Sequence, residues 1–142
     1  MGSVEEIIVT PLARIPVVGG DVLRAMKSDD IGYVNFGESY FSIVHPGAIK
    51  AWKRHLLMTL NLVVPIGLVR FIFIDQKNSK RVEDIGVGRY SRITVPPGIW
   101  FGFRGMSEEN SLILNIADIK HDETEVERKD LAEYSIEWGV KR

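Results

Sequence analysis

Two side chains capable of proton chemistry, Lys53 and His55, lie two positions apart in Ile49–His55, a segment whose pattern predicts a strand. Residues i and i+2 of a strand point to the same face, so the ammonium and the imidazole are expected on one side. Histidine titrates near neutrality, and a nearby ammonium would lower its pKa and keep it a neutral base. We therefore interpret His55 as the candidate general base and Lys53 as a cation beside it. Asp118 and Asp122 are candidates to orient a histidine ring.

Further polar and aromatic side chains allow two interpretations each. Trp52 and Trp100 either stack on a base or sugar or pack in the core. Arg70 lies in the apolar segment Leu68–Asp75, where a charge is costly unless paired, so it either contacts an anion or points outward. Tyr90 is a candidate acid, although nothing in its spacing requires that role.

The elements that must position these side chains are short strands. Eight segments rich in β-branched and aromatic residues are separated by turns that contain Gly or Pro, such as Pro46–Gly47 and Pro96–Pro97–Gly98, and this pattern is typical of a sandwich or barrel. The sequence also predicts a helix from Thr124, where a capping box begins, to about Ala132, and a shorter one near Val22–Lys27. The predicted strands are Glu6–Thr10, Ser39–His45, Ile49–His55, Leu60–Val64, Leu68–Asp75, Val82–Val87, Ser91–Val95 and Ser111–Ile116.

Composition narrows the class of protein. The 142 residues contain 45% hydrophobic and 26% charged side chains, which suits one domain spanning residues 1–142. The formal net charge of −1 gives no basic field for nucleic acid or an anionic membrane surface. Cysteine is absent, which excludes disulfides and thiolate chemistry. The acidic start lacks the basic region of a leader, and polar residues interrupt the apolar stretch 56–74, so we expect no membrane span and a cytoplasmic protein.

Two motifs resemble those of the cupin fold. The first is Gly47–His55, closed by Gly67, and the second is Val95–Phe103. In cupins the first motif carries His-x-His and later Glu, and the second carries Pro-x-Gly-x-x-His; together these side chains bind a metal. Here Lys53 stands at the first His position, His55 at the second and Phe101 at the third. A protonated lysine repels a cation, so we expect no metal and no other cofactor.

Within the cupins, the chain resembles the dTDP-4-dehydrorhamnose 3,5-epimerase family and its shorter relatives in nucleotide-sugar and surface-polysaccharide pathways. The stretches that carry the resemblance are Phe36–Phe41, Pro46–Trp52, Val95–Trp100 and Glu133–Trp138, with Asp21 and Arg24 near an early family element. The resemblance implies an all-β cupin fold, a double-stranded β-helix (jelly-roll barrel) with minor short helices. It also implies a homodimer paired through edge strands.

The resemblance further implies which residues bind and react. The family uses a His base, a Tyr acid and basic side chains that hold a diphosphate, without a metal. Its base falls on Lys53, its Tyr near Ile113 and its enolate-stabilising Lys near Leu60, so this chain departs from the proton-transfer residues. Lys53 and His55 remain as candidate catalytic residues. The candidate substrate-binding residues are Lys50, Arg24, Trp52, Asn61, Arg70, Trp100 and Asn115.

Three functions are compatible with these residues. The first is a 3,5-epimerase-like enzyme acting on a dTDP-4-keto-6-deoxyhexose type of nucleotide sugar, or the related 3,4-ketoisomerase. The second is a sugar-nucleotide-binding cupin that has lost catalysis, and the third is a metal-dependent cupin enzyme. In the first two cases the expected partner is a nucleotide-sugar small molecule, with neither nucleic acid nor membrane.

Overall fold

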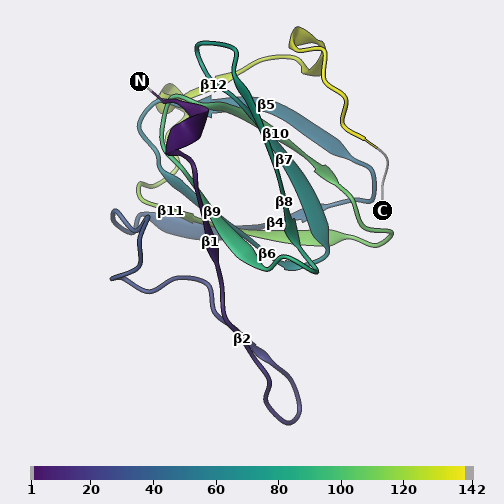
Figure 1. The fold of residues 1–142 in the computed structure, drawn as a ribbon. Coiled ribbons are helices and arrows are strands. Elements are labelled where there is room, and N and C mark those ends of the chain that lie inside the picture. Colours follow the sequence, from purple (N-terminus) through teal and green to yellow (C-terminus); the bar gives the residue numbers. More distant parts are fainter. Residues whose placement is uncertain (1, 140–142) are drawn as a thin grey trace.

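The computed structural model describes residues 2–139, which form two antiparallel sheets facing each other (Figure 1). One sheet has the order β1-β9-β6-β11-β4 and the other the order β12-β5-β10-β7-β8. The strands are β1 (Ile8–Pro11), β2 (Arg14–Ile15), β3 (Val22–Leu23), β4 (Glu38–Val44), β5 (Ile49–His55), β6 (Leu60–Ile66), β7 (Leu68–Ile74), β8 (Lys80–Gly86), β9 (Ser91–Val95), β10 (Trp100–Gly105), β11 (Ser111–Ala117) and β12 (Val126–Arg128). Short 3-10 helices lie at Val4–Glu6, Glu123–Glu125 and Leu131–Glu133.

Alternation of side chains decides what each sheet buries. In β11, Ile113, Asn115 and Ala117 are buried against the opposite sheet, whereas the intervening Leu114 and Ile116 are only half-buried on the outer face. Because successive strand residues point to opposite faces, the sequence of β11 fixes which of its residues can line the interior. The inner faces enclose a core of aliphatic and aromatic side chains.

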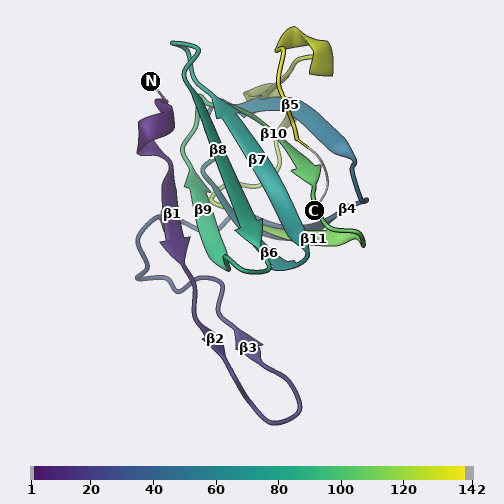
Figure 2. The ribbon, with the colours of Figure 1, turned by 45° about the vertical axis from the view of Figure 1, so that its right-hand side comes forward.

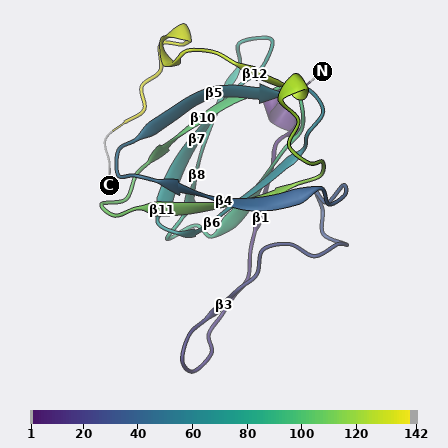
Figure 3. The ribbon, with the colours of Figure 1, turned by 180° about the vertical axis from the view of Figure 1, so that it is seen from behind.

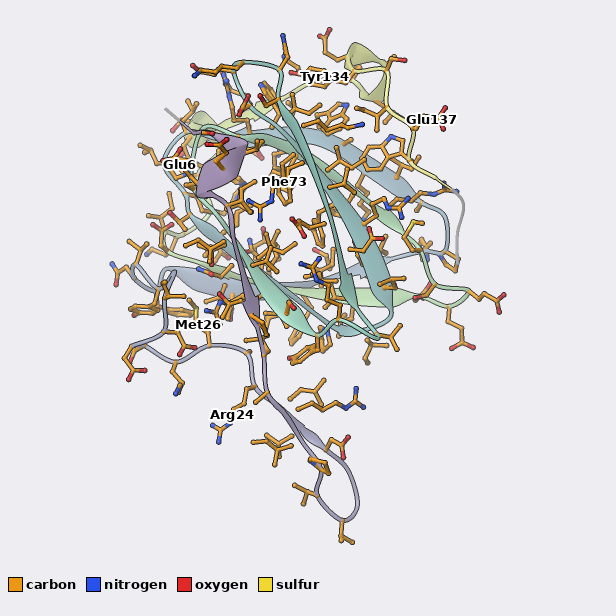
Figure 4. All side chains as sticks on the ribbon, in the orientation of Figure 1. Glu6, Arg24, Met26, Phe73, Tyr134 and Glu137 are labelled. Carbon is orange, nitrogen blue, oxygen red and sulfur yellow. The ribbon has the colours of Figure 1, made fainter. Side chains whose placement is uncertain are left out.

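Strand β7 is buried almost throughout because both of its faces are covered. Phe71 and Phe73 belong to the core between the sheets, and the label of Phe73 lies over that region in Figure 4. Ile72 and Ile74 instead join a second cluster on the outer face. The C-terminal residues 134–138 pack over that outer cluster, on the right of Figure 2.

A two-stranded arm, β2–β3, extends from the body of the molecule (Figures 1 and 3). The segment after it returns across the outer face of the first sheet, where Arg92 is fully buried. The guanidinium of Arg92 donates to the carbonyls of Ala25 (2.7 Å) and Ile31 (2.8 Å). A buried cation is tolerated here because carbonyl oxygens bind both of its terminal nitrogens and the Asp30 carboxylate lies 3.5 Å away, and these contacts hold residues 25–31 on the sheet.

The all-β prediction is confirmed, and Ile49–His55 and Ser91–Val95 have the predicted bounds. The two predicted helices are wrong. The region 124–132 is divided between 3-10 turns and strand β12, because Val126–Arg128 pairs with β5. Val22–Leu23 pairs with β2 in the arm. In both cases, strand pairing outweighs the local preference for a helix. Among residues 2–139 the model has no helix with the length and apolar character of a membrane span.

Candidate functional site

A cavity of about 300 Å³ lies between the two sheets, on the side where β4, β5 and β11 meet. The core fills the other side, around β7, β8 and β9. Polar groups and apolar walls alternate around this cavity, which is the character of a small-molecule site. Its lining comprises Tyr40, Ser42, Lys50, Ala51, Trp52, Lys53, His55, Leu60, Leu62, Phe101, Phe103, Ile113, Asn115 and Arg128.

His55 and Glu125 form a buried pair at the wall of the cavity. The imidazole Nδ1 lies 2.5 Å from the Glu125 Oε2, and the two side chains are 5% and 2% exposed. Glu125 Oε1 also accepts from the backbone N–H groups of Leu57 (3.0 Å) and Met58 (2.9 Å). A carboxylate that accepts three hydrogen bonds requires the histidine proton on Nδ1, so Nε2 carries the free lone pair. Among the described residues, Nε2 has no hydrogen-bond partner.

The electrostatics of this pair favour a neutral base beside an anion. Burial lowers the pKa of His55, with a further contribution from the Lys53 charge; Glu125 opposes the shift without reversing it. Burial alone would raise the pKa of Glu125, but hydrogen bonds from His55 and from the Leu57 and Met58 amides lower it overall. Phe101 stacks on the imidazole with 6.3 Å between ring centroids and contributes to its burial. At neutral pH the pair is therefore imidazole with carboxylate.

The ring of His55 should titrate below the ordinary value of 6.5, because its pKa is lowered by burial and by Lys53. Catalysis that uses neutral His55 should then persist just below pH 6.5 and decline as the pH falls through the lowered pKa. Ring NMR of the wild type, with the signals assigned by their loss in His55→Asn, measures this value. A pKa above 6.5 would contradict the neutral-base arrangement.

An extra residue in β5 turns two lysines into the same cavity. Phe101 of β10 pairs with Lys53 and Gly102 pairs with Ala51, so Trp52 has no partner on β10 and forms a bulge. Phe103 pairs with Lys50. Since Phe101 and Phe103 share a face, the strand neighbours Lys50 and Lys53 share that face too. Simple alternation would have placed these lysines on opposite faces.

The bulge is fixed from outside by the C-terminal segment. The Trp52 amide and carbonyl bond to Lys129 (3.0 and 3.1 Å), and Trp52 Nε1 donates to the Leu131 carbonyl (3.3 Å). The indole packs edge-on against Tyr134 and at 5.4 Å from Trp138. Trp138 approaches β10 at Gly102, where a Cβ would lie 3.1 Å from its ring. Figure 4 shows Tyr134 outside the sheets.

The two tryptophans that were predicted to stack on substrate therefore have their rings on the outer face of the sheet. Trp52 borders the cavity, but its indole lies in the outer cluster. Trp100 belongs to the same outer cluster, and Arg54 and Lys129 lie over its ring at 4.8 and 4.5 Å. Adjacent residues of β10 point to opposite faces, so Phe101 faces the cavity and Trp100 cannot.

Three cations line the cavity: Lys50, Lys53 and Arg128. Burial lowers the pKa of Lys53, and the Arg128 charge lowers it further. Lys50 donates to the Ile43 carbonyl (3.3 Å), and Arg128 forms a two-pronged pair with Glu123 (2.9 and 3.1 Å). Because these cations repel one another, the cavity is suited to an anionic ligand.

A phenol and an amide form the opposite wall. Tyr40 and Asn115 are directly paired residues of β4 and β11, and Asn115 Nδ2 donates to the Tyr40 hydroxyl (2.9 Å). This arrangement leaves the phenolic proton available to a ligand. Tyr90, the tyrosine that the sequence offered as an acid, is remote from the cavity because its hydroxyl donates to the Arg24 carbonyl.

Besides Trp100, three of the predicted binding residues lie away from the cavity. Arg24 is exposed on the arm, pointing away from the body (Figure 4). Asn61 faces the outside of its sheet, where it donates to the Gly32 carbonyl (3.1 Å) and accepts from Thr94. Arg70 pairs with Asp84 through two bonds and donates to the Trp138 carbonyl (2.9 Å). The polar groups of Asn61 and Arg70 are therefore hydrogen-bonded within the protein, away from the cavity.

Sequence reasoning missed Glu125, Tyr40 and Arg128. Glu125 falls within the segment for which a helix was predicted, so it was not considered beside a strand. Asp118 and Asp122, the expected partners of a histidine, bond instead to the Thr59 amide and to Thr124. The alternation of Glu38–Val44 could have placed Tyr40 on an inner face, but it could not tell which face is inner. Within residues 2–139, no group of three or more His, Asp or Glu side chains is placed to hold a metal ion.

The two-sheet architecture with a polar cavity between the sheets is that of a cupin. No protein-family model matches the chain. It is 33% identical to a dTDP sugar isomerase from Desulfovibrio desulfuricans G20, with a TM-score of 0.90 over 97% of this chain and 94% of that structure. The chain therefore belongs to the dTDP-sugar epimerase and isomerase family of cupins.

Two further similarities are weaker. A probable low-salt glycan biosynthesis epimerase, Agl13, of Haloferax volcanii is 29% identical over 104 residues, covering 68% of this chain and 67% of that protein. The 3,4-ketoisomerase QdtA of Thermoanaerobacterium thermosaccharolyticum, solved in complex with TDP, has a TM-score of 0.77 at 15% identity over 89% of this chain and 90% of that one. At that identity the likeness concerns the fold.

Proposed function

We propose that this protein isomerises a dTDP-linked 4-keto-6-deoxyhexose by removing the proton from C3, beside the ketone. The observation that carries the proposal is the buried His55–Glu125 pair at the cavity wall, with Nδ1 held at 2.5 Å and Nε2 free. A general base needs a neutral lone pair in the cavity and a partner that fixes its tautomer, and this pair supplies both. A binding protein that had lost catalysis would not require a buried carboxylate hydrogen-bonded to the imidazole.

In the proposed step, His55 Nε2 takes the C3 proton. The C–H electron pair moves into the C3–C4 bond, and the C4 carbonyl becomes an enolate. Lys53 supplies positive charge near the developing oxyanion. Tyr40 then gives its phenolic proton to carbon from the other wall, and proton exchange with solvent restores His55 and Tyr40. Protonation of C3 on the opposite face yields the epimer.

The remaining cations account for the nucleotide. We assign Lys50 and Arg128 to the diphosphate, because both line the cavity and phosphate oxygens accept from several donors. The TDP complex of the structurally similar ketoisomerase supports a nucleotide ligand of this kind. The Haloferax epimerase supports a role in glycan biosynthesis, and we propose 3,5-epimerisation as the reaction.

Proton exchange tests the proposal. The protein is incubated with dTDP-4-keto-6-deoxyglucose in D₂O, and the C3 and C5 protons of the sugar are followed by NMR. Loss of the C3 signal at a rate proportional to the protein concentration is expected. Absence of exchange, with line broadening of the nucleotide, would identify a non-catalytic binder and overturn the proposal.

The product separates the two reactions available to this site. Exchange at C3 and C5 with inversion at both identifies a 3,5-epimerase. Exchange at C3 alone, with the carbonyl moved from C4 to C3, identifies a 3,4-ketoisomerase. The specific observation that favours the second reaction is the position of the base, because His55 lies two residues after Lys53, the position on which the base of the 3,5-epimerase family falls.

A further inference from the structure

The wall formed by β4 and β11 contains a buried amide that is only half satisfied. Asn115 is 3% exposed, lines the cavity and donates through Nδ2 to Tyr40. Its Oδ1 is buried and has no hydrogen-bond partner within the described residues. A buried acceptor without a donor costs about 1–3 kcal/mol, so such a group calls for an explanation.

The neighbours of Asn115 do not supply that donor. Its cross-strand partners are Tyr40, which already accepts the Nδ2 proton, and Leu62, which is apolar. Ile113, two residues earlier on the same face, is apolar too. Asn115 lines the cavity, and the terminal torsion of an asparagine has a broad energy well, so the amide can adjust to a ligand without a change in the backbone. A hydroxyl of a ligand in the cavity would supply the missing donor.

We infer that Asn115 Oδ1 is the acceptor for a ring hydroxyl of the sugar, adjacent to the carbon that Tyr40 protonates. This inference rests on the proposed function and concerns which sugars the same site selects. Because Tyr40 and Asn115 are directly opposed residues, the hydroxyl and the protonated carbon are neighbours. A hydroxyl donates and therefore satisfies Oδ1, whereas a ketone or a deoxy position leaves it unpaired. Asn115 thereby selects hydroxylated sugars and orients the phenol through Nδ2.

Binding measured in the His55→Asn background, where turnover is removed, tests the inference. Calorimetry compares dTDP-4-keto-6-deoxyglucose with its 2-deoxy and 3-deoxy forms and with dTDP alone. Asn115→Leu, which has similar volume, should weaken the parent sugar about tenfold to a hundredfold. The same substitution should have little effect on the 2-deoxy form and on dTDP, because C2 carries the hydroxyl adjacent to C3, the carbon that Tyr40 protonates. Tyr40→Phe, which removes the neighbouring hydroxyl but keeps Oδ1, is the matched control and should retain the difference between the parent and that deoxy sugar.

The outcomes separate the inference from the function on which it rests. An equal loss of affinity for the parent and both deoxy sugars would show that Oδ1 accepts from no sugar hydroxyl, even if C3 exchange occurs in the wild type. An equal loss with dTDP alone would assign the acceptor to the nucleotide and overturn the inference. No binding of the parent sugar would contradict both the substrate class and the inference.

Discussion

Replacing His55 by asparagine is expected to lower the rate of C3 proton exchange by about 10²–10⁴-fold. The substitution removes Nε2, the basic atom, but its amide can still donate to Glu125, so the buried carboxylate keeps a partner. The affinity for dTDP should change little, because the proposed diphosphate contacts come from Lys50 and Arg128. Single-turnover exchange in D₂O measures the rate, and calorimetry with dTDP measures the binding.

His45→Asn is the matched control for this substitution. His45 is exposed and its Nδ1 lies 3.1 Å from Asn110 Oδ1, away from the cavity. Exchange in His45→Asn should equal that of the wild type. Wild-type exchange in His55→Asn would show that another group removes the proton, and Lys53 would then be the base to test.

Replacing Glu125 by glutamine should have the second-largest effect, because the amide reverses the tautomer of His55. Two backbone amides, those of Leu57 and Met58, donate to Oε1 and so require an oxygen there. The glutamine NH₂ must then face Nδ1 and donate to it, which places the imidazole proton on Nε2. A base with its proton already on the reactive nitrogen is inactive, so exchange should fall on the order of 10³–10⁴-fold.

The same substitution should also destabilise the fold by about 1–3 kcal/mol, since it replaces charge-assisted hydrogen bonds inside the protein. Denaturant unfolding measures this change. Glu127→Gln is the control two residues along β12, because Glu127 pairs with Arg54 at the surface and does not line the cavity. Equal losses of exchange in Glu125→Gln and Glu127→Gln would refute the role of tautomer control.

Local sequence patterns predicted most of the strands. Strand β9 illustrates why: Ser91–Val95 is rich in β-branched residues and ends at the turn Pro96–Pro97–Gly98, and both signals depend only on residues close together in the chain. The same reasoning placed Lys53 and His55 on one face, and both line the cavity. Three binding candidates, Lys50, Trp52 and Asn115, also line it.

The failures share a physical cause, which is pairing between distant segments. Glu125 lies 70 positions after His55, and only the pairing of β12 with β5 brings the two side chains together. The capping box predicted at Thr124 does not form, because Asp122 caps the short 3-10 helix Glu123–Glu125 and Val126–Arg128 pairs with β5.

The sequence by itself determined an all-β chain whose strand at Ile49–His55 carries a base and cations, because strand period and turn chemistry depend on residues close together. Only the tertiary structure decided which face of each strand is the interior. The bulge at Trp52, fixed by the C-terminal residues, turned Lys50 inward, and pairing across the sheets supplied Glu125 and Tyr40. These choices arise from contacts between residues far apart in the chain, which no local pattern encodes.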